Sequence, residues 1–333
     1  MGPAVDEKTA QKDAVGLVEE IYETLGRGNK DSLFTLLVDS LIVFGPRGKD
    51  SMTTRADVLV ALAEVVDPRA KKQVALRSGS LEVVASPGGR SAWAFDIINV
   101  NGEPHAMMAI LTNSDDLWLV EAVSLAHTPS KGTVKTELAK DAVVPPGSSG
   151  PKQSGDGADG AVERFRKGLL AQELWGEDLG SRSDAVFVGP AAGEVTRGKK
   201  ELKKLWKKRV EMKTRAAASG EITAAVTADG QLAWVSAPIT RVAEEEDPLP
   251  LRAFAVFEKT ADSWKLIALQ ESLAVGAPGA GTAFKKIVPP ALEAKPPEVV
   301  EASKPDKQVE TTKKKTKKKK QLKKKKKPVD DDE

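Results

Sequence analysis

The strongest constraint on the fold is an internal repeat, in which two similar segments follow each other along the chain. The first runs from about residue 13 to 127 and the second from about residue 161 to 275. LIVFGP (41–46) matches AVFVGP (185–190), and Thr-Arg, Ser-Gly, Ala-Trp and SLA landmarks follow in the same order, offset by 141 to 148 residues. A solenoid needs three or more short units, so two long copies predict two duplicated domains.

Each copy begins with apolar residues at helical spacing and ends in strand-like runs. In the first copy a helix ends near residue 25, a short second helix capped by Asn29 or Asp31 extends through Leu37, and a strand covers 40–45. A third helix runs over about 54–66, and its apolar stretch favours packing on the other domain or a second chain. The later strand-like runs cover about 72–85, 90–100, 104–112 and 117–126. Helices followed by hairpin-linked strands predict an α+β fold with an antiparallel sheet.

Composition shifts set the expected domain boundaries. Residues 143–160 are rich in Pro, Gly, Ser and charge, and the chain beyond about residue 289 has too little apolar surface to form a core. We therefore expect domain 1 over 10–130, a flexible linker over 131–160, domain 2 over 161–276, and a disordered linker and lysine-rich tail over 277–333.

These landmarks carry a family resemblance. A first helix with Tyr22, a strand ending in FGP or VGP, a Thr-Arg-led helix and a tryptophan-containing sheet resemble the nuclear transport factor two-like superfamily, in its SnoaL-like and ketosteroid-isomerase-like branch. The resemblance implies two tandem cone-shaped α+β domains, with helices closing a curved antiparallel sheet around an apolar pocket. Members include isomerases, cyclases, dehydratases and non-catalytic binding domains, so the fold alone selects no function.

The residues that the isomerase members need are mostly missing. Their chemistry uses a carboxylate base together with a tyrosine and a protonated acid that stabilise the enolate. Tyr22 matches the tyrosine, but Phe165 replaces it in the second copy, and the base positions are Gly45 and Gly189. The strands expected to carry the second acid, which are the segments HAMMAIL and LRAFAVF, hold no carboxylate. The sequence therefore predicts no catalytic residue.

Other polar and aromatic side chains are candidates for the wall of a pocket. They are Tyr22, Trp93, Asp96, His105, Trp118 and Glu121 in the first copy and Trp234, Arg252, Trp264 and Gln270 in the second. A neutral histidine, His105 or His127, beside a carboxylate can do acid–base work near pH 7. The alternative places these residues in the core, at strand ends or on the solvent face, and alternation does not decide because several strands are apolar on both faces.

The composition excludes several kinds of site. There is no cysteine, which excludes disulfides and thiolate sites, and two histidines make a zinc site a poor expectation. GAPGAGT (276–282) lacks the lysine of a phosphate-binding loop, so we expect no cofactor and no metal. No stretch reaches the length of a membrane span, and the first residues lack the apolar core of a signal peptide. We therefore predict a cytoplasmic protein.

Positive charge is concentrated at the C-terminus. Residues 311–333 hold twelve lysines and four acidic residues, so with a net charge of +3 for the whole chain the other 310 residues carry −5. Such a tail binds polyanions without reading sequence, or serves only to solubilise the chain. Its lysines are Lys313, Lys314, Lys315, Lys317, Lys318, Lys319, Lys320, Lys323, Lys324, Lys325, Lys326 and Lys327. A predicted helix over 197–213 is also lysine-rich, and its lysine face is either solvated or meets an anion.

Two interpretations remain open. In the first, the chain is a non-enzymatic ligand-binding or scaffold protein whose domains pair within the chain, with a lysine tail for nucleic acid or an acidic partner. In the second, the pocket of domain 1 is an isomerase-, cyclase- or hydratase-like site for a small apolar substrate. The position of His105 and His127 relative to Asp96 or Glu121 separates the two. The sequence does not say whether a further dimer forms.

Overall fold

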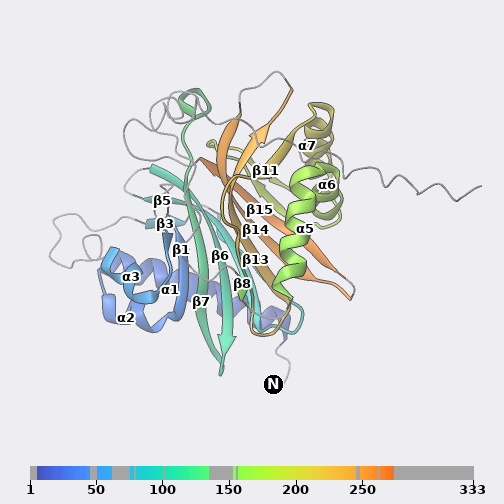
Figure 1. Ribbon diagram of the computed structural model, residues 1–333. Helices are drawn as coiled ribbons and strands as arrows, with labels where there is room; N and C mark the ends of the chain where they lie inside the picture. Colours follow the sequence, from blue (N-terminus) through green and yellow to red (C-terminus); the bar gives the residue numbers. More distant parts are fainter. Residues whose placement is uncertain are drawn as a thin grey trace, which may run out of the picture. The chain divides into compact units, whose positions relative to one another are not determined.

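The computed structural model describes residues 6–45, 51–61, 76–78, 80–100, 103–134, 153–154, 157–244, 248–261 and 263–273. They form two α+β domains with the same order of elements, blue to green and green to orange in Figure 1. The α+β fold class predicted from the repeat is confirmed. The lysine-rich tail lies outside the described residues.

Domain 1 begins with two helices and continues into a sheet. Its helices are α1 (Glu7–Arg27), α2 (Lys30–Thr35) and α3 (Arg55–Ala61). Its strands are β1 (Leu37–Phe44), β2 (Ser51–Met52), β3 (Leu76–Ser78), β4 (Glu82–Ala85), β5 (Ser91–Val100), β6 (Glu103–Ser114) and β7 (Leu117–His127). The predicted helix near residue 54 begins with a reciprocal cap, because the Thr54 hydroxyl donates to the Asp57 carboxylate at 2.7 Å and accepts from the Asp57 backbone N–H at 3.1 Å. The side chain of Val60 is 75% exposed, so at this position the helix does not pack on the other domain, and packing on a second chain stays a prediction.

Domain 2 repeats this order. Its helices are α5 (Ala158–Leu170), α6 (Gln172–Leu179) and α7 (Lys199–Glu211). Its strands are β8 (Gln153–Ser154), β9 (Val186–Val188), β10 (Val195–Arg197), β11 (Arg215–Ala218), β12 (Thr223–Val226), β13 (Leu232–Val242), β14 (Leu249–Lys259) and β15 (Trp264–Leu273). β8 and the start of α5 fall within the range expected to be linker. β8 pairs with β12 through its backbone, and composition gives no signal for such pairing.

The two sheets have matching topologies. The first has the order β2-β1-β7-β6-β5-β3, with β4 also on β5; the second has the order β10-β9-β15-β14-β13-β12-β8, with β11 also on β13. The long strands pair antiparallel as predicted, but β1 pairs parallel with β7, and β9 parallel with β15. Parallel strands need a long connection between them, and in each domain the elements that lie between the two paired strands in the sequence form that connection. Spacing along the chain does not reveal this pairing.

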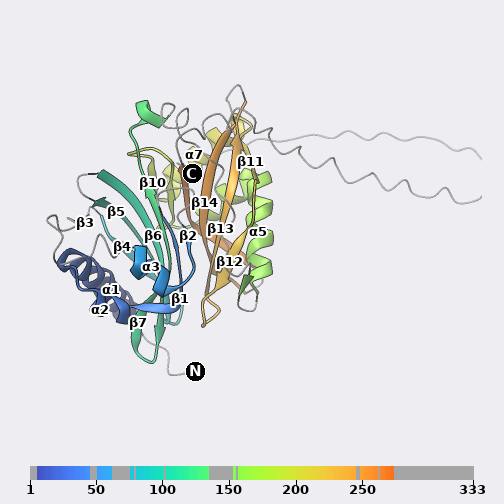
Figure 2. The ribbon, with the colours of Figure 1, turned by 60° about the vertical axis from the view of Figure 1, so that its left-hand side comes forward.

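Both faces of each sheet are buried. On β5, Ala92 and Ala94 face a core shared with the helices of domain 1, whereas Trp93 and Phe95 belong to a second core that also contains Trp234 of domain 2. Successive strand residues point to opposite faces, so a strand buried on both sides loses its polar alternation. The two sheets therefore pack against each other through the faces that do not carry helices, as Figure 2 illustrates.

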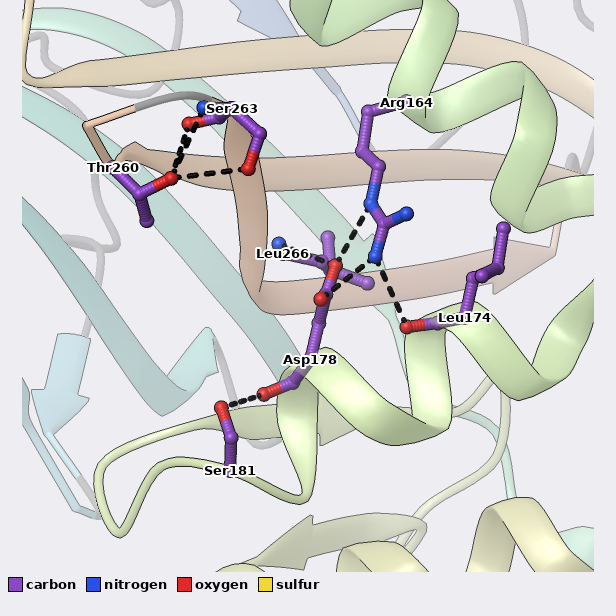
Figure 3. Close-up of polar contacts among 7 residues, drawn as sticks. All are labelled: Arg164, Leu174, Asp178, Ser181, Thr260, Ser263 and Leu266. Carbon is purple, nitrogen blue, oxygen red and sulfur yellow. Dashed lines mark hydrogen bonds and ion pairs between the residues drawn. The ribbon is translucent and has the colours of Figure 1, made fainter.

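A buried ion pair ties the helices of domain 2 to their sheet. Arg164 of α5 donates from Nε and Nη2 to the carboxylate of Asp178 on α6, at 3.1 and 2.8 Å. The same carboxylate accepts the backbone N–H of Leu266 on β15 at 3.1 Å (Figure 3). Asp178 is 6% exposed, so this bidentate contact fixes how α5, α6 and β15 meet.

Candidate functional site

The helix-facing side of the domain 1 sheet holds a small polar group. The hydroxyl of Tyr22 on α1 donates to Asp96 Oδ2 of β5 at 3.1 Å and lies 3.5 Å from the sulfur of Met107. Asp96 is fully buried and also accepts the backbone N–H of Ser80 at 2.8 Å. Burial, followed by the charge and hydrogen bond of Asp96, raises the pKa of Tyr22 far above its ordinary value. The hydroxyl therefore stays protonated and acts as a donor.

The two histidines lie on the same face of the sheet. His105 of β6 stands directly opposite His127 of β7, and their ring centroids are 5.3 Å apart. His105 is two residues from Met107, which pairs with Asp96, so alternation puts the histidine pair beside the Tyr22–Asp96 group. Trp118 contributes to the core on this face. Domain 1 thus places four of the residues proposed from the sequence on one face of its sheet, Tyr22, Asp96, His105 and Trp118, and the contact shown among them is that of Tyr22 with Asp96.

This face is less completely covered in domain 1 than in domain 2. Val43 and Val123 pair on neighbouring strands and are only partly buried. Their counterparts by strand pairing are Phe187 and Leu269, which are 3% and 0% exposed. At these paired positions, among the residues that the structure describes, the helix-facing side of domain 1 is therefore less buried than that of domain 2.

The equivalent side of domain 2 is filled by an ion cluster. Glu271 of β15 is 1% exposed and accepts two hydrogen bonds from Arg209 of α7, at 2.9 and 2.7 Å. Arg241 of β13 donates to it at 2.6 Å. Burial alone would raise the pKa of Glu271, but the two arginines lower it to about 2. With Trp175 and Trp206 buried alongside, the cluster leaves this side of domain 2 built for stability.

The positions of the missing base have structural roles. The carbonyl oxygen of Gly45 accepts a hydrogen bond from Arg252 of domain 2 at 2.8 Å. At Gly189 a Cβ atom would come within 2.6 Å of the Glu194 carboxylate and 2.9 Å of its Cβ atom. A carboxylate side chain at residue 189 would thus require Glu194 to move.

Five of the proposed pocket residues lie between the domains instead. Gln270 donates to the backbone oxygen of Ala106 at 3.0 Å, and the indole of Trp234 donates to Glu121 at 3.4 Å. Trp93, Trp234 and the side chain of Arg252 border the core shared by the two sheets. Trp264, the remaining candidate, packs with the domain 2 helices and donates to the oxygen of Gly157 at 3.2 Å.

Sequence reasoning missed one carboxylate of this interface. Asp229, in the turn before β13, accepts hydrogen bonds from Ser91 at 2.8 Å and Ser86 at 3.3 Å, both in domain 1. Its Asp-Gly sequence signalled a turn, but a turn residue gives no sign of a distant partner. A small cavity also lies at the interface, between Phe44, Ser51, Thr223 and Arg252. It offers about 10 Å³, which is room for one water molecule.

Glu121 makes the interface sensitive to pH. Burial raises the pKa of Glu121 to about 7; the Trp234 hydrogen bond opposes the rise and the charge of Asp229 adds to it. Between pH 4.5 and 7 the folded chain holds this proton more tightly than the unfolded chain, so stability falls as pH rises through that window.

Glu121→Gln is therefore expected to stabilise the protein at pH 8, by about 1–3 kcal/mol, and to change stability by less than about 0.5 kcal/mol at pH 4.5. Urea unfolding at both pH values measures the difference. The exposed Glu211→Gln is the control and should show no such dependence. An equal effect of Glu121→Gln at both pH values would contradict the assignment.

Comparison with known families agrees with this fold. Residues 172–276 match the family model of the SnoaL-like domain. The second domain is therefore similar to SnoaL-like domains over these residues. The predicted resemblance to the nuclear transport factor two-like superfamily is thereby confirmed, and the first domain shares the topology of this SnoaL-like domain. No curated protein matches the chain.

Several solved structures are similar to one domain at a time. A nuclear transport factor two-like protein of unknown function from Pseudomonas putida is 10% identical, covering 38% of this chain and 92% of its own, with a TM-score of 0.34. Similar proteins from Silicibacter pomeroyi and Cytophaga hutchinsonii are 13% and 14% identical, each covering 37% of this chain and 99% of its own, with TM-scores of 0.31 and 0.30.

The described residues were also considered as metal ligands and as membrane-spanning helices, and they suit neither role. Among them, no group of three or more His, Asp or Glu side chains is arranged to hold a metal ion. None of their helices combines the length and apolar character needed to cross a bilayer.

Proposed function

We propose that the chain is a non-enzymatic scaffold and binding protein, built as a pair of SnoaL-like domains in one polypeptide. The observation that carries this proposal is the apolar core shared by the two sheets, which buries Trp93, Phe95, Trp234 and Phe254 from both domains. A shared core of this kind fixes two domains as one body. The cytoplasmic location remains a prediction from the sequence.

Within this scaffold, domain 1 is the proposed ligand-binding domain. The Tyr22 hydroxyl donates its one hydrogen bond to Asp96, and its oxygen, beside apolar side chains, can accept a hydrogen bond, which suits a small apolar molecule with one donor group. The ion cluster around Glu271 fills the corresponding side of domain 2. Binding to one domain and rigidity in the other fit a scaffold better than two active sites.

The second candidate function is an isomerase- or hydratase-like activity in domain 1. The observation that favours it is the placement of His105 and His127 on the face that holds Tyr22 and Asp96. Against it, Gly45 occupies the position of the base, and its carbonyl is already bonded to Arg252.

Native mass spectrometry of residues 1–287 tests the ligand-binding role. The expected result is the mass of one chain carrying a small molecule, which is lost in Tyr22→Phe because the hydroxyl oxygen that accepts from the molecule is removed. Thr35→Val, which removes a hydroxyl from the exposed end of α2, should retain it. A bare chain in every preparation would contradict ligand binding. Turnover of the released molecule by the wild-type chain would favour the enzyme.

The lysine tail is proposed to tether this scaffold to a polyanion. Twelve lysines within residues 313–327 bind by releasing counterions, without reading bases. Deleting residues 311–333 is expected to weaken binding to a labelled 25-base-pair duplex of mixed sequence by at least about 100-fold at 100 mM KCl. Fluorescence anisotropy measures it. Unchanged affinity after deletion would leave the tail with a solubilising role only.

A further inference from the structure

The exposed face of α7 carries a concentrated positive charge on folded structure. Six lysines occur within ten residues, and the side chain of each is exposed: Lys199, Lys200, Lys203, Lys204, Lys207 and Lys208. The helix has two glutamates, Glu201 and Glu211, and Lys207 lies 3.9 Å from Glu211. Across the part of the chain that the structure describes, Lys200, Lys203, Lys204 and Lys208 make no ion pair.

This arrangement is unfavourable for the chain alone. Lys199 and Lys200 occupy the first turn, next to the positive end of the helix dipole, and the N-cap residue Gly198 supplies no side-chain acceptor. Lys200 and Lys204, like Lys204 and Lys208, are like charges four residues apart. A bound anion would relieve both kinds of repulsion.

The structure holds this face rigidly. Leu202 and Trp206 are 0% and 2% exposed, and Arg209 is fixed by its two hydrogen bonds to Glu271. The corresponding helix of domain 1, α3, has the sequence RADVLVA and no lysine. The lysines are therefore not a requirement of the fold.

We infer that the lysine face of α7 is a second contact surface for nucleic acid, binding the phosphodiester backbone together with the tail. The inference rests on the tail binding proposed above and adds a folded contact to it. With a rise of 1.5 Å per residue, the lysines from Lys200 to Lys208 span about 12 Å, along which a duplex presents a charge about every 1.7 Å.

Other partners fit this surface less well. A protein partner is expected to bury an apolar centre, and on α7 the exposed apolar residue Val210 lies at the end of the lysine array. A helix that inserts into a lipid surface needs a free apolar face, but that of α7 is buried through Leu202 and Trp206. The exposed lysine face has neither arginine nor aromatic side chains, so binding should not depend on sequence.

The test uses the full chain and the labelled 25-base-pair duplex between 50 and 200 mM KCl. One variant replaces Lys200, Lys203, Lys204 and Lys208 with glutamine, which keeps helix propensity. The control changes charge equally at four exposed lysines elsewhere, Lys8, Lys12, Lys131 and Lys265. Thermal unfolding followed by circular dichroism checks that both variants fold.

The α7 variant is expected to bind at least about 10-fold more weakly at 100 mM KCl and to lower the slope of log K against log salt by about 3. In the control variant, both the loss of affinity and the change in the salt slope should be less than half of those in the α7 variant. Equal losses in both variants, or no loss in the α7 variant, would overturn the inference. No loss in the α7 variant, with binding abolished by tail deletion, would leave the tail proposal intact. Binding of polyglutamate as tight as that of the duplex would overturn it in favour of an acidic protein.

Discussion

Glu271→Gln is expected to destabilise the protein by about 3–5 kcal/mol at pH 7, because it removes the buried carboxylate that accepts hydrogen bonds from the buried Arg209 and the partly buried Arg241. Arg209 and Arg241 would keep their charges with no anion to offset them. Glutamine preserves the shape of the side chain and one acceptor oxygen, so the decrease in the free energy of unfolding measures mainly the effect of the lost negative charge. The free energy of unfolding in urea measures it.

The pH dependence of this loss is a second part of the same prediction. The arginines lower the pKa of Glu271 to about 2, so its contribution is present above about pH 4.5 and declines as pH falls towards 2. The gap between Glu271→Gln and the wild type should narrow over that range. Glu244→Gln, which breaks the exposed pair with Lys213, is the control and should cost under about 1 kcal/mol. A similarly small cost for Glu271→Gln would contradict the assignment.

Trp234→Ala is expected to lower stability by about 3–5 kcal/mol and to loosen both domains together. The indole is 1% exposed, stacks on Phe254 with centroids 5.9 Å apart, and meets the edge of Phe44 from domain 1 at 6.1 Å. Its removal opens a cavity in the core that the two sheets share. Hydrogen exchange of β6 in domain 1, together with urea unfolding, measures the effect.

The matched control for this prediction is Trp175→Ala. Trp175 is equally buried in domain 2 but packs on the helix-facing side, against Phe165. The two variants should lose similar stability, yet only Trp234→Ala should speed exchange in β6 by local opening. Slow, unchanged exchange in β6 of Trp234→Ala would show that the domains do not depend on each other.

The sequence predicts the fold well because the repeat samples the same pattern twice. The Thr54 cap and the antiparallel order of the long strands follow from local signals of periodicity and turn chemistry. The pairing of the two sheets does not, since Ala92 and Trp93 are both apolar and alternation cannot say which neighbour each meets. The parallel β1–β7 pair likewise depends on residues about 80 apart.

The candidate site was predictable only in part. The family resemblance pointed to Tyr22, but the acid was expected on the β6 strand, whereas the carboxylate that meets the hydroxyl is Asp96 on β5. The sequence offers Glu271 as a polar candidate in the last strand but does not indicate its partners, because Arg209 lies 62 residues away along the chain and Arg241 lies 30 residues away. The lysine face of α7, by contrast, was predictable from the sequence, because the helical periodicity of the apolar residues is enough to place the lysines on the opposite face.

Cutting the chain between its domains tests the central claim most directly. A protease site placed between residues 140 and 150, outside the described residues, allows the full chain to be nicked after folding. If the sheets share one apolar core, the two fragments should stay together as a one-to-one complex in size-exclusion chromatography at about 1 μM. Fragments that separate into two folded monomers, or that exchange into homodimers, would contradict the account.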